Sequence, residues 1–406
     1  MFDRRNFLRT STAALTAASY SRVLGANDRI GFGIVGTGSR GSYLMREMSK
    51  LDDVRWSALC DIYDVRLQQA KAKAPDAKTF ADYRELLAAS GVDAVIIATP
   101  DHWHAAMTID ACRAGKDVYV EKPMTSQPQQ GVEVCRVVSQ TKRIVQVGTQ
   151  QRSGPHYIEA FQKVIKRGLL GKVGLVRCWY NSNGGYLYKP PEGMEKKPDG
   201  LNWDRYLGWL PKIPWDAKRY FNRFAYFDIS TGGQTGGLFV HLVDTVNWYL
   251  NIDKPSAVYA GGGIYQFDDG RDTPDVVNMI CEYPQKLNVT FEAEVLTVGV
   301  NDDVPKAAME FHGTGGILVV YRDPAPLGWV YSPNQNNKAV GRLSGPYVSA
   351  SAEPHLRNWV ECIRTRQRPV ADEVAGHYGA MPCHMGNMAL KSRNRVDWSR
   401  KWDLRA

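Results

Sequence analysis

The chain has 406 residues, more than one hydrophobic core usually holds, and this length predicts two domains behind a short leader. Its composition is that of an ordinary globular protein, and no apolar run is long enough to cross a bilayer, so stable membrane insertion is not expected. The net charge is +9, but four arginines against one aspartate lie in the first 26 residues. The remaining basic residues are scattered and not interleaved with aromatics, so nucleic acid is not expected as a partner.

The leader resembles a bacterial twin-arginine export signal. It contains Arg4-Arg5-Asn6-Phe7-Leu8-Arg9, followed by a weakly apolar stretch rich in Ala, Thr and Ser over residues 11–24. We therefore expect a signal over residues 1–26, recognition by the twin-arginine export machinery, and a periplasmic or otherwise exported protein. The alternative is an N-terminal helix with two chance arginines.

The seven cysteines form no C-x-x-C pair and mostly lie in apolar stretches. This pattern indicates small buried side chains, and neither a metal site nor a disulfide framework is expected. An exported protein could still oxidise one pair, and the odd number leaves at least one thiol free.

A Gly-rich turn follows the first apolar run, residues 30–35. The turn reads Gly36-Thr37-Gly38-Ser39-Arg40-Gly41 and opens a helix. Gly36 permits the tight turn, Gly38 lets the backbone approach a pyrophosphate, and Gly41 allows close packing of helix on strand. Asp61, after a second strand at residues 54–60, is placed to bind the ribose hydroxyls of NAD and to repel the 2′-phosphate of NADP. NAD is therefore expected, but Arg40 could hold that phosphate and leaves NADP open.

Helical and strand-like segments alternate after the turn. Helices are expected at residues 83–89, 104–114 and 131–140, and strands at residues 94–98, 118–120 and 144–148. This alternation predicts an α/β fold with a doubly wound parallel sheet, a Rossmann domain over residues 27–150, whose ligands lie beyond the carboxyl ends of the strands.

Two polar segments follow strands of this sheet, Thr99-Pro100-Asp101-His102-Trp103-His104 and Glu121-Lys122-Pro123. With the Gly-rich turn and the later Arg368-Pro369 and Gly386-Asn387-Met388-Ala389, they resemble the glucose-fructose oxidoreductase, inositol dehydrogenase and rhizopine catabolism protein (Gfo/Idh/MocA) family. The resemblance spans nearly the whole mature chain. It implies a second α/β domain whose open, mostly antiparallel sheet floors the active site and often mediates oligomers, so a homo-oligomer is expected.

The resemblance also implies that Lys122 is catalytic, because the family's lysine lies beside the nicotinamide and the substrate hydroxyl. A partly desolvated ammonium near the positive nicotinamide should have a lowered pKa and exchange protons near neutrality. Glu121 would orient it, and Pro123, often cis in relatives, would fix the turn. The remaining residues expected at the cofactor are Thr99, Pro100, His102 and His104. Either histidine could equally be a hydrogen-bonding support.

Residues 151–390 are expected to form the substrate-binding domain, with a tail over residues 391–406. A helix at residues 157–167 and a strand at 175–180 precede a long irregular stretch over residues 183–235. A loop of this length is usually functional. Aromatic faces suit sugar rings, yet we expect most aromatics in it to be packing residues: Tyr186, Tyr188, Trp203, Tyr206, Trp209, Trp215 and Tyr220.

A helix over residues 236–250 carries His241, the second catalytic candidate. The family commonly places an aspartate and a histidine four residues apart here, and the histidine acts on the substrate hydroxyl. Gly237 stands at the aspartate position, which weakens a simple polyol dehydrogenase interpretation. Asp244 shares the helix face and could support His241, while the alternative for His241 is a buried structural histidine.

Strand-like runs at residues 257–261, 276–283, 287–295, 307–312 and 317–321, with hairpin spacing around Pro284, predict an antiparallel sheet. Helices near residues 354–364 and 374–390 close the domain.

Together these features predict an NAD(P)-dependent oxidoreductase that transfers hydride on a sugar, polyol or sugar derivative, with Lys122 and His241 sharing proton transfer. One alternative is a glycoside hydrolase that retains NAD, oxidises a ring carbon, eliminates the glycosidic substituent and reduces the ring again. Another alternative is a non-catalytic, cofactor-bound periplasmic sugar-binding module. Its only support is the glycine at position 237 in place of the family's aspartate.

Overall fold

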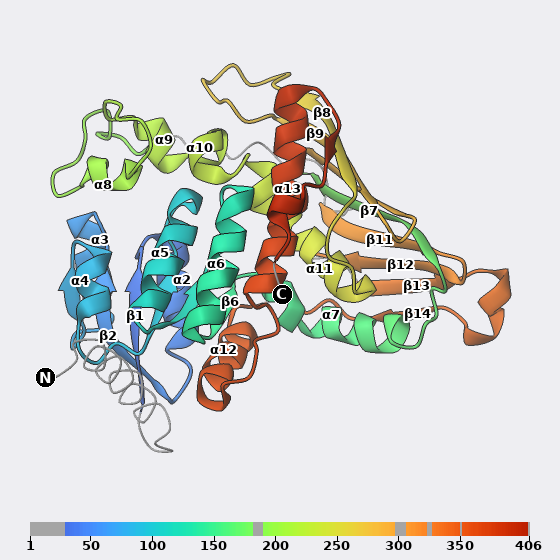
Figure 1. Ribbon diagram of the computed structural model, residues 1–406, viewed down its shortest axis with the longest axis horizontal. Helices are drawn as coiled ribbons and strands as arrows, with labels where there is room; N and C mark the ends of the chain where they lie inside the picture. Colours follow the sequence, from blue (N-terminus) through green and yellow to red (C-terminus); the bar gives the residue numbers. More distant parts are fainter. Residues whose placement is uncertain (1–28, 182–189, 297–305, 323–326, 350, 405–406) are drawn as a thin grey trace, which may run out of the picture.

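The computed structural model describes residues 29–181, 190–296, 306–322, 327–349 and 351–404. They form two sheets with their covering helices, one sheet in each half of the molecule (Figure 1). The expected export signal and two of the expected aromatics, Tyr186 and Tyr188, lie outside the described residues.

The first sheet is parallel, with the strand order β3-β2-β1-β4-β5-β6. Its strands are β1 (Ile30–Val35), β2 (Val54–Cys60), β3 (Lys78–Phe80), β4 (Ala94–Ile97), β5 (Asp117–Val120) and β6 (Val145–Val147). The order reverses between β1 and β4, which places the ligand crevice of a doubly wound sheet at their carboxyl ends. The predicted Rossmann sheet is confirmed.

The helices between its strands cover the two faces of this sheet: α2 (Ser39–Met48), α3 (Asp64–Lys71), α4 (Tyr83–Ala88), α5 (Asp101–Arg113) and α6 (Pro128–Thr141). Helix α5 begins three residues before the predicted start, because Pro100 supplies its N-cap and Asp101 suits the positive end of the helix dipole. Helix α3 and strand β3 were not predicted. Helix α3 has only two buried residues and β3 is three residues long, so neither carries a strong periodic pattern.

In the part of the chain that the structure describes, the second sheet has nine strands in the order β14-β13-β12-β11-β7-β10-β9-β8-β15. They are β7 (Val173–Asn181), β8 (Ala257–Gly263), β9 (Val276–Tyr283), β10 (Leu287–Glu294), β11 (Ala307–Gly313), β12 (Gly316–Tyr321), β13 (Trp329–Pro333), β14 (Leu343–Gly345) and β15 (Val396–Asp397). Only β7 and β10 pair in parallel among the described strands of this sheet. The prediction of an open, mostly antiparallel sheet is confirmed, and Tyr283 faces Leu287 across the expected hairpin.

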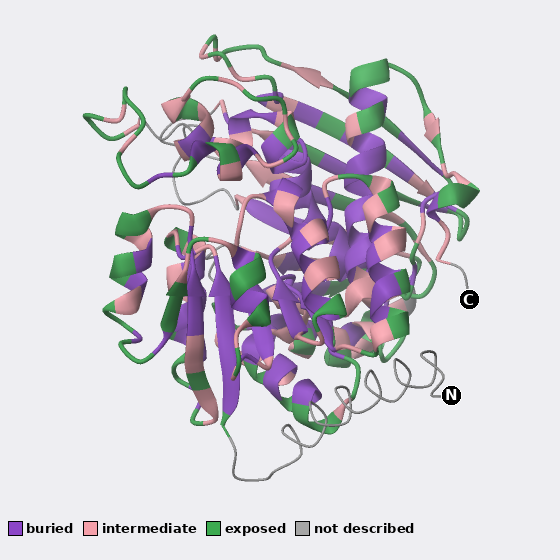
Figure 2. Cartoon of the chain, turned by 60° about the vertical axis from the view of Figure 1, so that its left-hand side comes forward, coloured by how far each residue is buried: buried purple, intermediate pink, exposed green. Residues whose placement is uncertain are grey.

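Helices cover the inner face of the second sheet and enclose its core (Figure 2). The helix predicted from residue 236 begins as a π-helical turn, η4 (Thr235–Phe239), and continues as α11 (Val240–Leu250). Helix α13 (Glu373–Ser392) packs beside α11. The predicted helix at residues 157–167 is α7 (Pro155–Ala160), followed by the π-helical η2 (Phe161–Ile165).

Packing corrects the expected domain assignment at two places. Helix α12 (Glu353–Thr365) lies within the chain range expected for the second domain, but its Trp359 ring packs 5.4 Å from the ring of Phe32 in the first core. The expected tail instead supplies β15, which pairs with β8, and Trp402, which is buried in the second core. The apolar side chains of these short segments decide which core each segment joins. The position of a segment in the chain does not reveal that core.

All seven cysteines are buried, as their apolar surroundings predicted, and their thiols are free. Within the described ranges, no helix is both long enough and apolar enough to cross a bilayer.

Candidate active site

A cavity of about 580 Å³ lies between the carboxyl ends of the Rossmann strands and a segment of the second domain. Its volume lies in the range of small-molecule and cofactor sites. From the first domain, the predicted residues that line it are Gly36, Gly38, Ser39, Arg40, Asp61, Thr99, Pro100, His104, Glu121 and Lys122. From the second domain, the lining includes Tyr206, Tyr220, Phe221, Asn222, Arg223 and Phe224.

The Gly-rich turn has the geometry that a pyrophosphate site needs. Gly36 has a φ of +87°, and a Cβ there would lie 2.7 Å from the carbonyl oxygen of Ala98. A Cβ on Gly41 would overlap the carbonyl oxygen of Gly36, so Gly41 packs against the turn and does not line the cavity. Gly38 caps α2 without a side-chain hydrogen bond, and the first turn of α2 carries no acid. The amides of this helix end are therefore available to an anion.

Asp61 ends β2 at the other side of the turn and faces the cavity. Its carboxylate accepts hydrogen bonds from the backbone N of Thr37 at 2.7 Å and from the backbone N of Tyr63 at 3.0 Å. These bonds fix the carboxylate where the ribose hydroxyls of a dinucleotide would lie.

The side chain of Arg40 lies at the end of the cavity opposite Asp61. Its Nε donates to Oε1 of Glu121 at 2.7 Å, beside Lys122. This ion pair removes the reason for expecting Arg40 to hold a 2′-phosphate. A different guanidinium, that of Arg66, lies next to Gly38 and over the ring of Tyr220, 4.9 Å from its centroid. The turn, the free helix end and Asp61 together fit NAD.

Lys122 lies half-buried at the inner end of the cavity, and its Nζ donates to the carbonyl oxygen of Gly237 at 2.8 Å. Burial lowers the pKa of Lys122 to about 8, although the nearby carboxylate of Asp101 opposes this shift. The Lys122–Pro123 peptide bond is cis. Glu121 does not orient the ammonium as expected, because its carboxylate pairs with Arg40 and contacts only the backbone N of Lys122, at 3.3 Å.

The two histidines of α5 contact backbone carbonyl oxygens. His104 lines the cavity, but its ring nitrogens contact the carbonyl oxygens of Pro123 at 2.7 Å and Thr99 at 2.9 Å. His102 does not belong to the described lining, which corrects its predicted place: its Nε2 contacts the carbonyl oxygen of Tyr206 at 2.9 Å. Burial lowers the pKa of His102 to about 4.

Thr99 is the better ligand candidate of this segment. Its Oγ1 is buried without a hydrogen-bond partner among the described residues, and the residue lines the cavity. Buried polar groups normally have a hydrogen-bond partner, which a ligand in the cavity would supply here.

His241 lies just behind Lys122, one helical turn after Gly237, and is not part of the described cavity lining. Its Nδ1 is buried and has no hydrogen-bond partner among the described residues. Burial, followed by the positive charges of Arg322 and Lys122, places the pKa of His241 well below its usual value. The ring is therefore neutral.

Asp244 does not support His241, contrary to the sequence hypothesis. Its carboxylate is buried and accepts from Nε and Nη2 of Arg152 at 2.8 Å and 2.9 Å. This two-pronged ion pair uses both carboxylate oxygens.

Most of the described aromatics of the long irregular stretch pack against one another, as expected. The ring of Trp203 lies 4.9 Å from that of Tyr206 and 5.0 Å from that of Trp215. Tyr206 and Tyr220 also line the cavity. Sequence reasoning missed Arg223 and Phe224 because no motif marks them, and only the fold of the stretch brings them to the cavity.

Comparison with protein-family models agrees with this architecture. A model described as "Oxidoreductase family, NAD-binding Rossmann fold" matches residues 30–149, and a model described as "GFO/IDH/MocA C-terminal domain" matches residues 211–319. Together the two matches cover more than half of the chain.

Inositol 2-dehydrogenase 1 from Saccharopolyspora erythraea is 32% identical over 163 residues, which are 39% of this chain and 48% of that protein. Glycosyl hydrolase family 109 protein 2 from Shewanella sp. is 31% identical over 173 residues, 35% of this chain and 38% of that protein. The matched regions span about half or less of these curated relatives.

Among solved structures, levoglucosan dehydrogenase in complex with NADH and levoglucosan has a TM-score of 0.70 at 18% identity, covering 91% of this chain and 99% of that one. At this identity the likeness shows the fold. With both family models matched in order, the chain belongs to the Gfo/Idh/MocA oxidoreductase family, whose Rossmann domain binds NAD.

Proposed function

We propose that this protein is an NAD-dependent oxidoreductase that moves a hydride between the nicotinamide and a hydroxyl-bearing carbon of a sugar, polyol or sugar derivative. The observation that carries the proposal is the position of Lys122, which lines the cavity with Nζ held at 2.8 Å by the carbonyl oxygen of Gly237 and with its pKa lowered to about 8. An amine titrating near neutrality can exchange a proton with a substrate hydroxyl. The names of the inositol and levoglucosan dehydrogenases above support the substrate class.

Residues at different places in the cavity have different roles. The amides at the start of α2 would hold the pyrophosphate, and the carboxylate of Asp61 would bind the adenosine ribose of the dinucleotide, which would supply the hydride acceptor. The neutral amine of Lys122 accepts the hydroxyl proton. His241 lies behind Lys122. Its ring is neutral, and its Nδ1 has no hydrogen-bond partner among the described residues, so it can take the proton on from Lys122.

The test is turnover of NAD with a panel of polyols, free sugars and sugar acids, followed by the absorbance of reduced nicotinamide. The Lys122→Met variant should lose about 10²- to 10⁴-fold in rate, the usual contribution of a general base, while it still binds the nucleotide. Equal rates in wild type and variant would remove Lys122 from the mechanism. Failure of the wild type to bind any dinucleotide would remove the proposal itself.

Export through the twin-arginine route is proposed for the same protein. Its support is the run Arg4-Arg5-Asn6-Phe7-Leu8-Arg9 and the weakly apolar stretch behind it. The route carries folded proteins, so NAD bound in the cytoplasm would travel inside the fold. Fractionation of cells that express wild type and the Arg4→Lys/Arg5→Lys variant tests this: the wild type should be exported and the variant retained.

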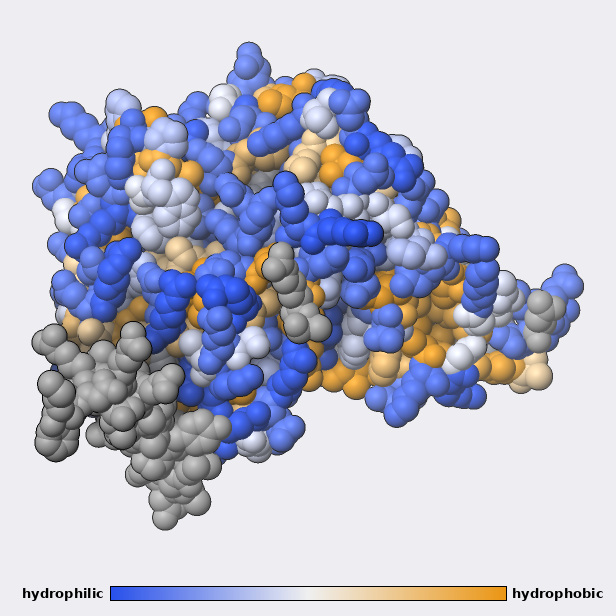
Figure 3. All heavy atoms as spheres, viewed as in Figure 1, coloured by the Kyte–Doolittle hydropathy of each residue, from blue (hydrophilic) through white to orange (hydrophobic). Residues whose placement is uncertain are grey.

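Self-association is proposed through the second domain. Apolar surface is visible on this half of the molecule, around α7 and the neighbouring strands (Figure 3). Among the exposed large apolar side chains of this domain are Ile158 on α7, 40% exposed, and Ile280 and Ile317 on the sheet, 44% and 38% exposed. A contiguous exposed apolar surface is typical of surfaces that pair, whereas single exposed apolar side chains are not. Light scattering at several protein concentrations would give the mass, and a monomer at every concentration would contradict the proposal.

A further inference from the structure

Asp101 is a buried carboxylate that the mechanism described above does not use. It is the first residue of α5, and its side chain is only 1% exposed. Its Oδ1 accepts from Nη1 of Arg223 at 2.6 Å, whereas its Oδ2 is buried without a hydrogen-bond partner among the described residues. Water screens a buried charge only weakly, so this carboxylate acts strongly on ionisable groups near it.

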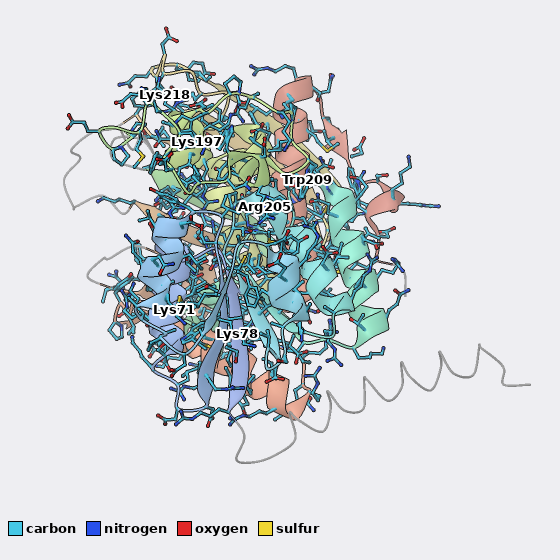
Figure 4. The ribbon with its side chains drawn as sticks, turned by 90° about the vertical axis from the view of Figure 1, so that its left-hand side faces the viewer. Lys71, Lys78, Lys197, Arg205, Trp209 and Lys218 are labelled. Atoms are coloured by element: carbon cyan, nitrogen blue, oxygen red, sulfur yellow. The ribbon has the colours of Figure 1, made fainter. Side chains whose placement is uncertain are left out.

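The cation of this pair, Arg223, comes from a distant part of the chain. It begins the short helix η3 (Arg223–Ala225), in a stretch over residues 202–226 that lies above the first domain (Figure 1). Arg205 and Trp209 of the same stretch are labelled above the first domain in Figure 4. The guanidinium of Arg223 lines the cavity, so the ion pair joins the two halves of the molecule beside it. The stretch also contains α8 (Trp203–Leu207) and α9 (Ala217–Phe221).

Arg223 and Lys122 lie against the same aromatic ring, that of Phe224. The guanidinium carbon of Arg223 is 4.4 Å from the ring centroid, and Nζ of Lys122 is 5.8 Å from it. The Nζ of Lys122 also donates to the carbonyl oxygen of Gly237, which carries no charge. An ammonium and a guanidinium at one apolar ring, with a buried carboxylate bound to the guanidinium, form a cluster in which each charge acts on the others.

The charges that face Lys122 come from several elements. Burial is the largest cause of its lowered pKa of about 8. Among the charges, Asp101 has the largest effect and raises the pKa of Lys122, and Arg223 follows and lowers it. Glu121 also raises this pKa, but its own cation Arg40 belongs to the same domain. The other ionisable groups that face Lys122 are Arg322, the neutral ring of His241 and the buried thiol of Cys383.

We propose that Asp101 and Arg223 are positioning residues that together set how tightly Lys122 holds its proton. This inference rests on the proposed function, in which Lys122 exchanges a proton with the substrate hydroxyl. The carboxylate favours the ammonium, which is the acid in carbonyl reduction, and the guanidinium favours the neutral amine, which is the base in alcohol oxidation. Because the two charges oppose each other, Lys122 can serve in both directions near neutrality.

The two charges predict shifts of opposite sign. Arg223→Gln removes the cation and leaves Asp101 acting alone, so the pKa of Lys122 should rise by about one unit. Asp101→Asn removes the anion and leaves Arg223, so this pKa should fall by a similar amount. The double variant removes both charges and should return the pKa close to the wild-type value. Loss of a purely structural contact would not give opposite shifts that cancel.

Competitive acetylation measures the pKa of Lys122 without turnover. The purified protein is treated with a trace of acetic anhydride across a pH series, and mass spectrometry gives the acetylated fraction of the peptide that contains Lys122, relative to a reference amine. Only the neutral amine reacts, so the labelling rate reports its fraction. The midpoint should lie near pH 8 in the wild type, higher in Arg223→Gln and lower in Asp101→Asn. The profile of kcat/KM for alcohol oxidation should shift by the same amounts.

Two controls separate charge from packing. Arg223→Lys keeps the charge and should keep the midpoint near that of the wild type. Arg219→Gln breaks another ion pair of the same stretch, with Asp228 at 2.5 Å, and Arg219 is not among the main charges that act on Lys122, so the midpoint should not move. Circular dichroism verifies that each variant is folded.

Asp101→Asn keeps the test decisive even if Arg223→Gln does not fold. Arg223→Gln leaves a buried carboxylate without its cation, which is a costly change, whereas Asp101→Asn leaves a guanidinium that is 31% exposed and can be hydrated. An unmoved midpoint in folded Asp101→Asn would overturn the proposal and leave Lys122 as the base. The expected shifts in a protein that turns over no polyol or sugar would support the electrostatic coupling and contradict the proposed function.

Discussion

Gly237 packs directly against Phe224 beside the inner end of the cavity, and a Cβ on Gly237 would lie 2.7 Å from Cε1 of Phe224. The carbonyl oxygen of the same Gly237 accepts a hydrogen bond from Nζ of Lys122, whose ammonium lies 5.8 Å from the centroid of the Phe224 ring. The aspartate expected at position 237 from the family pattern therefore has no room here. A backbone carbonyl and an aromatic ring surround Lys122 in its place.

Restoring that aspartate should harm the protein. Gly237→Asp forces a side chain against Phe224, and overpacking of this kind costs about 1–3 kcal/mol. We expect a lower melting temperature and a loss of turnover, because the helix turn that holds Lys122 must shift. Phe224→Ala removes the obstructing ring, so the double variant should regain part of the stability lost by Gly237→Asp. Strictly additive changes in the free energy of unfolding would show that the two side chains do not compete for the same space.

The pH dependence of turnover should follow Lys122. Its neutral amine accepts a proton during oxidation of an alcohol, so kcat/KM in that direction should rise as the pH increases through about 8. In the direction of carbonyl reduction the ammonium is the donor, and kcat/KM should fall over the same range. Steady-state rates in both directions give the two profiles. An inflection that persists unchanged in the residual activity of Lys122→Met would belong to another group.

Cofactor choice should depend on Asp61. Asp61→Ala removes the acceptor for the ribose hydroxyls and the repulsion of a 2′-phosphate, so NAD should bind about 10- to 100-fold more weakly and the preference over NADP should shrink. Calorimetric titration with both nucleotides measures this change. Asp61 also accepts from the backbone N of Thr37 at 2.7 Å, so Asp61→Asn serves as the variant of equal size. If the ratio of NAD affinity to NADP affinity were unchanged in both variants, the ribose would bind away from Asp61.

The Arg152–Asp244 pair should be structural. Asp244→Ala leaves the mostly buried guanidinium of Arg152 without its anion, and we expect a loss of about 3–5 kcal/mol in the free energy of unfolding. The matched control is Glu353→Ala, at an ion pair whose Arg357 side chain is 63% exposed, where we expect a change of no more than about 1 kcal/mol. Denaturant titration of both variants compares the two. Similar values would show that Asp244 contributes no more than a surface charge.

Some expected features did not depend on long-range packing and were predicted from the chain. The turn from Gly36 to Gly41 and the acid at Asp61 follow from short-range backbone demands, since tight turns and close approaches require glycine. Strands with strict alternation, such as β9 and β10, were located within one residue at their ends. Helix α3 and strand β3 were missed because they carry little apolar periodicity.

The hydrogen-bond and ion-pair partners of polar side chains were the features least predictable from the sequence. His102 was expected at the cofactor and binds the carbonyl of Tyr206 instead, more than a hundred residues away. Arg40 was weighed as a phosphate ligand and pairs with Glu121. Each charged or polar side chain had several partners within reach in principle, and only the packed fold selects one.

By itself the amino-acid sequence determined the α/β class, the dinucleotide turn and the family of this protein, because these depend on local patterns of glycine, apolar and acidic residues. The tertiary structure alone decided that Arg223 and Phe224 reach the cavity, that residues 191–226 cover it, and that α12 joins the first core. These features arise from contacts between residues far apart in the chain, whose selection depends on shape and burial in three dimensions and leaves no periodic signal in the sequence.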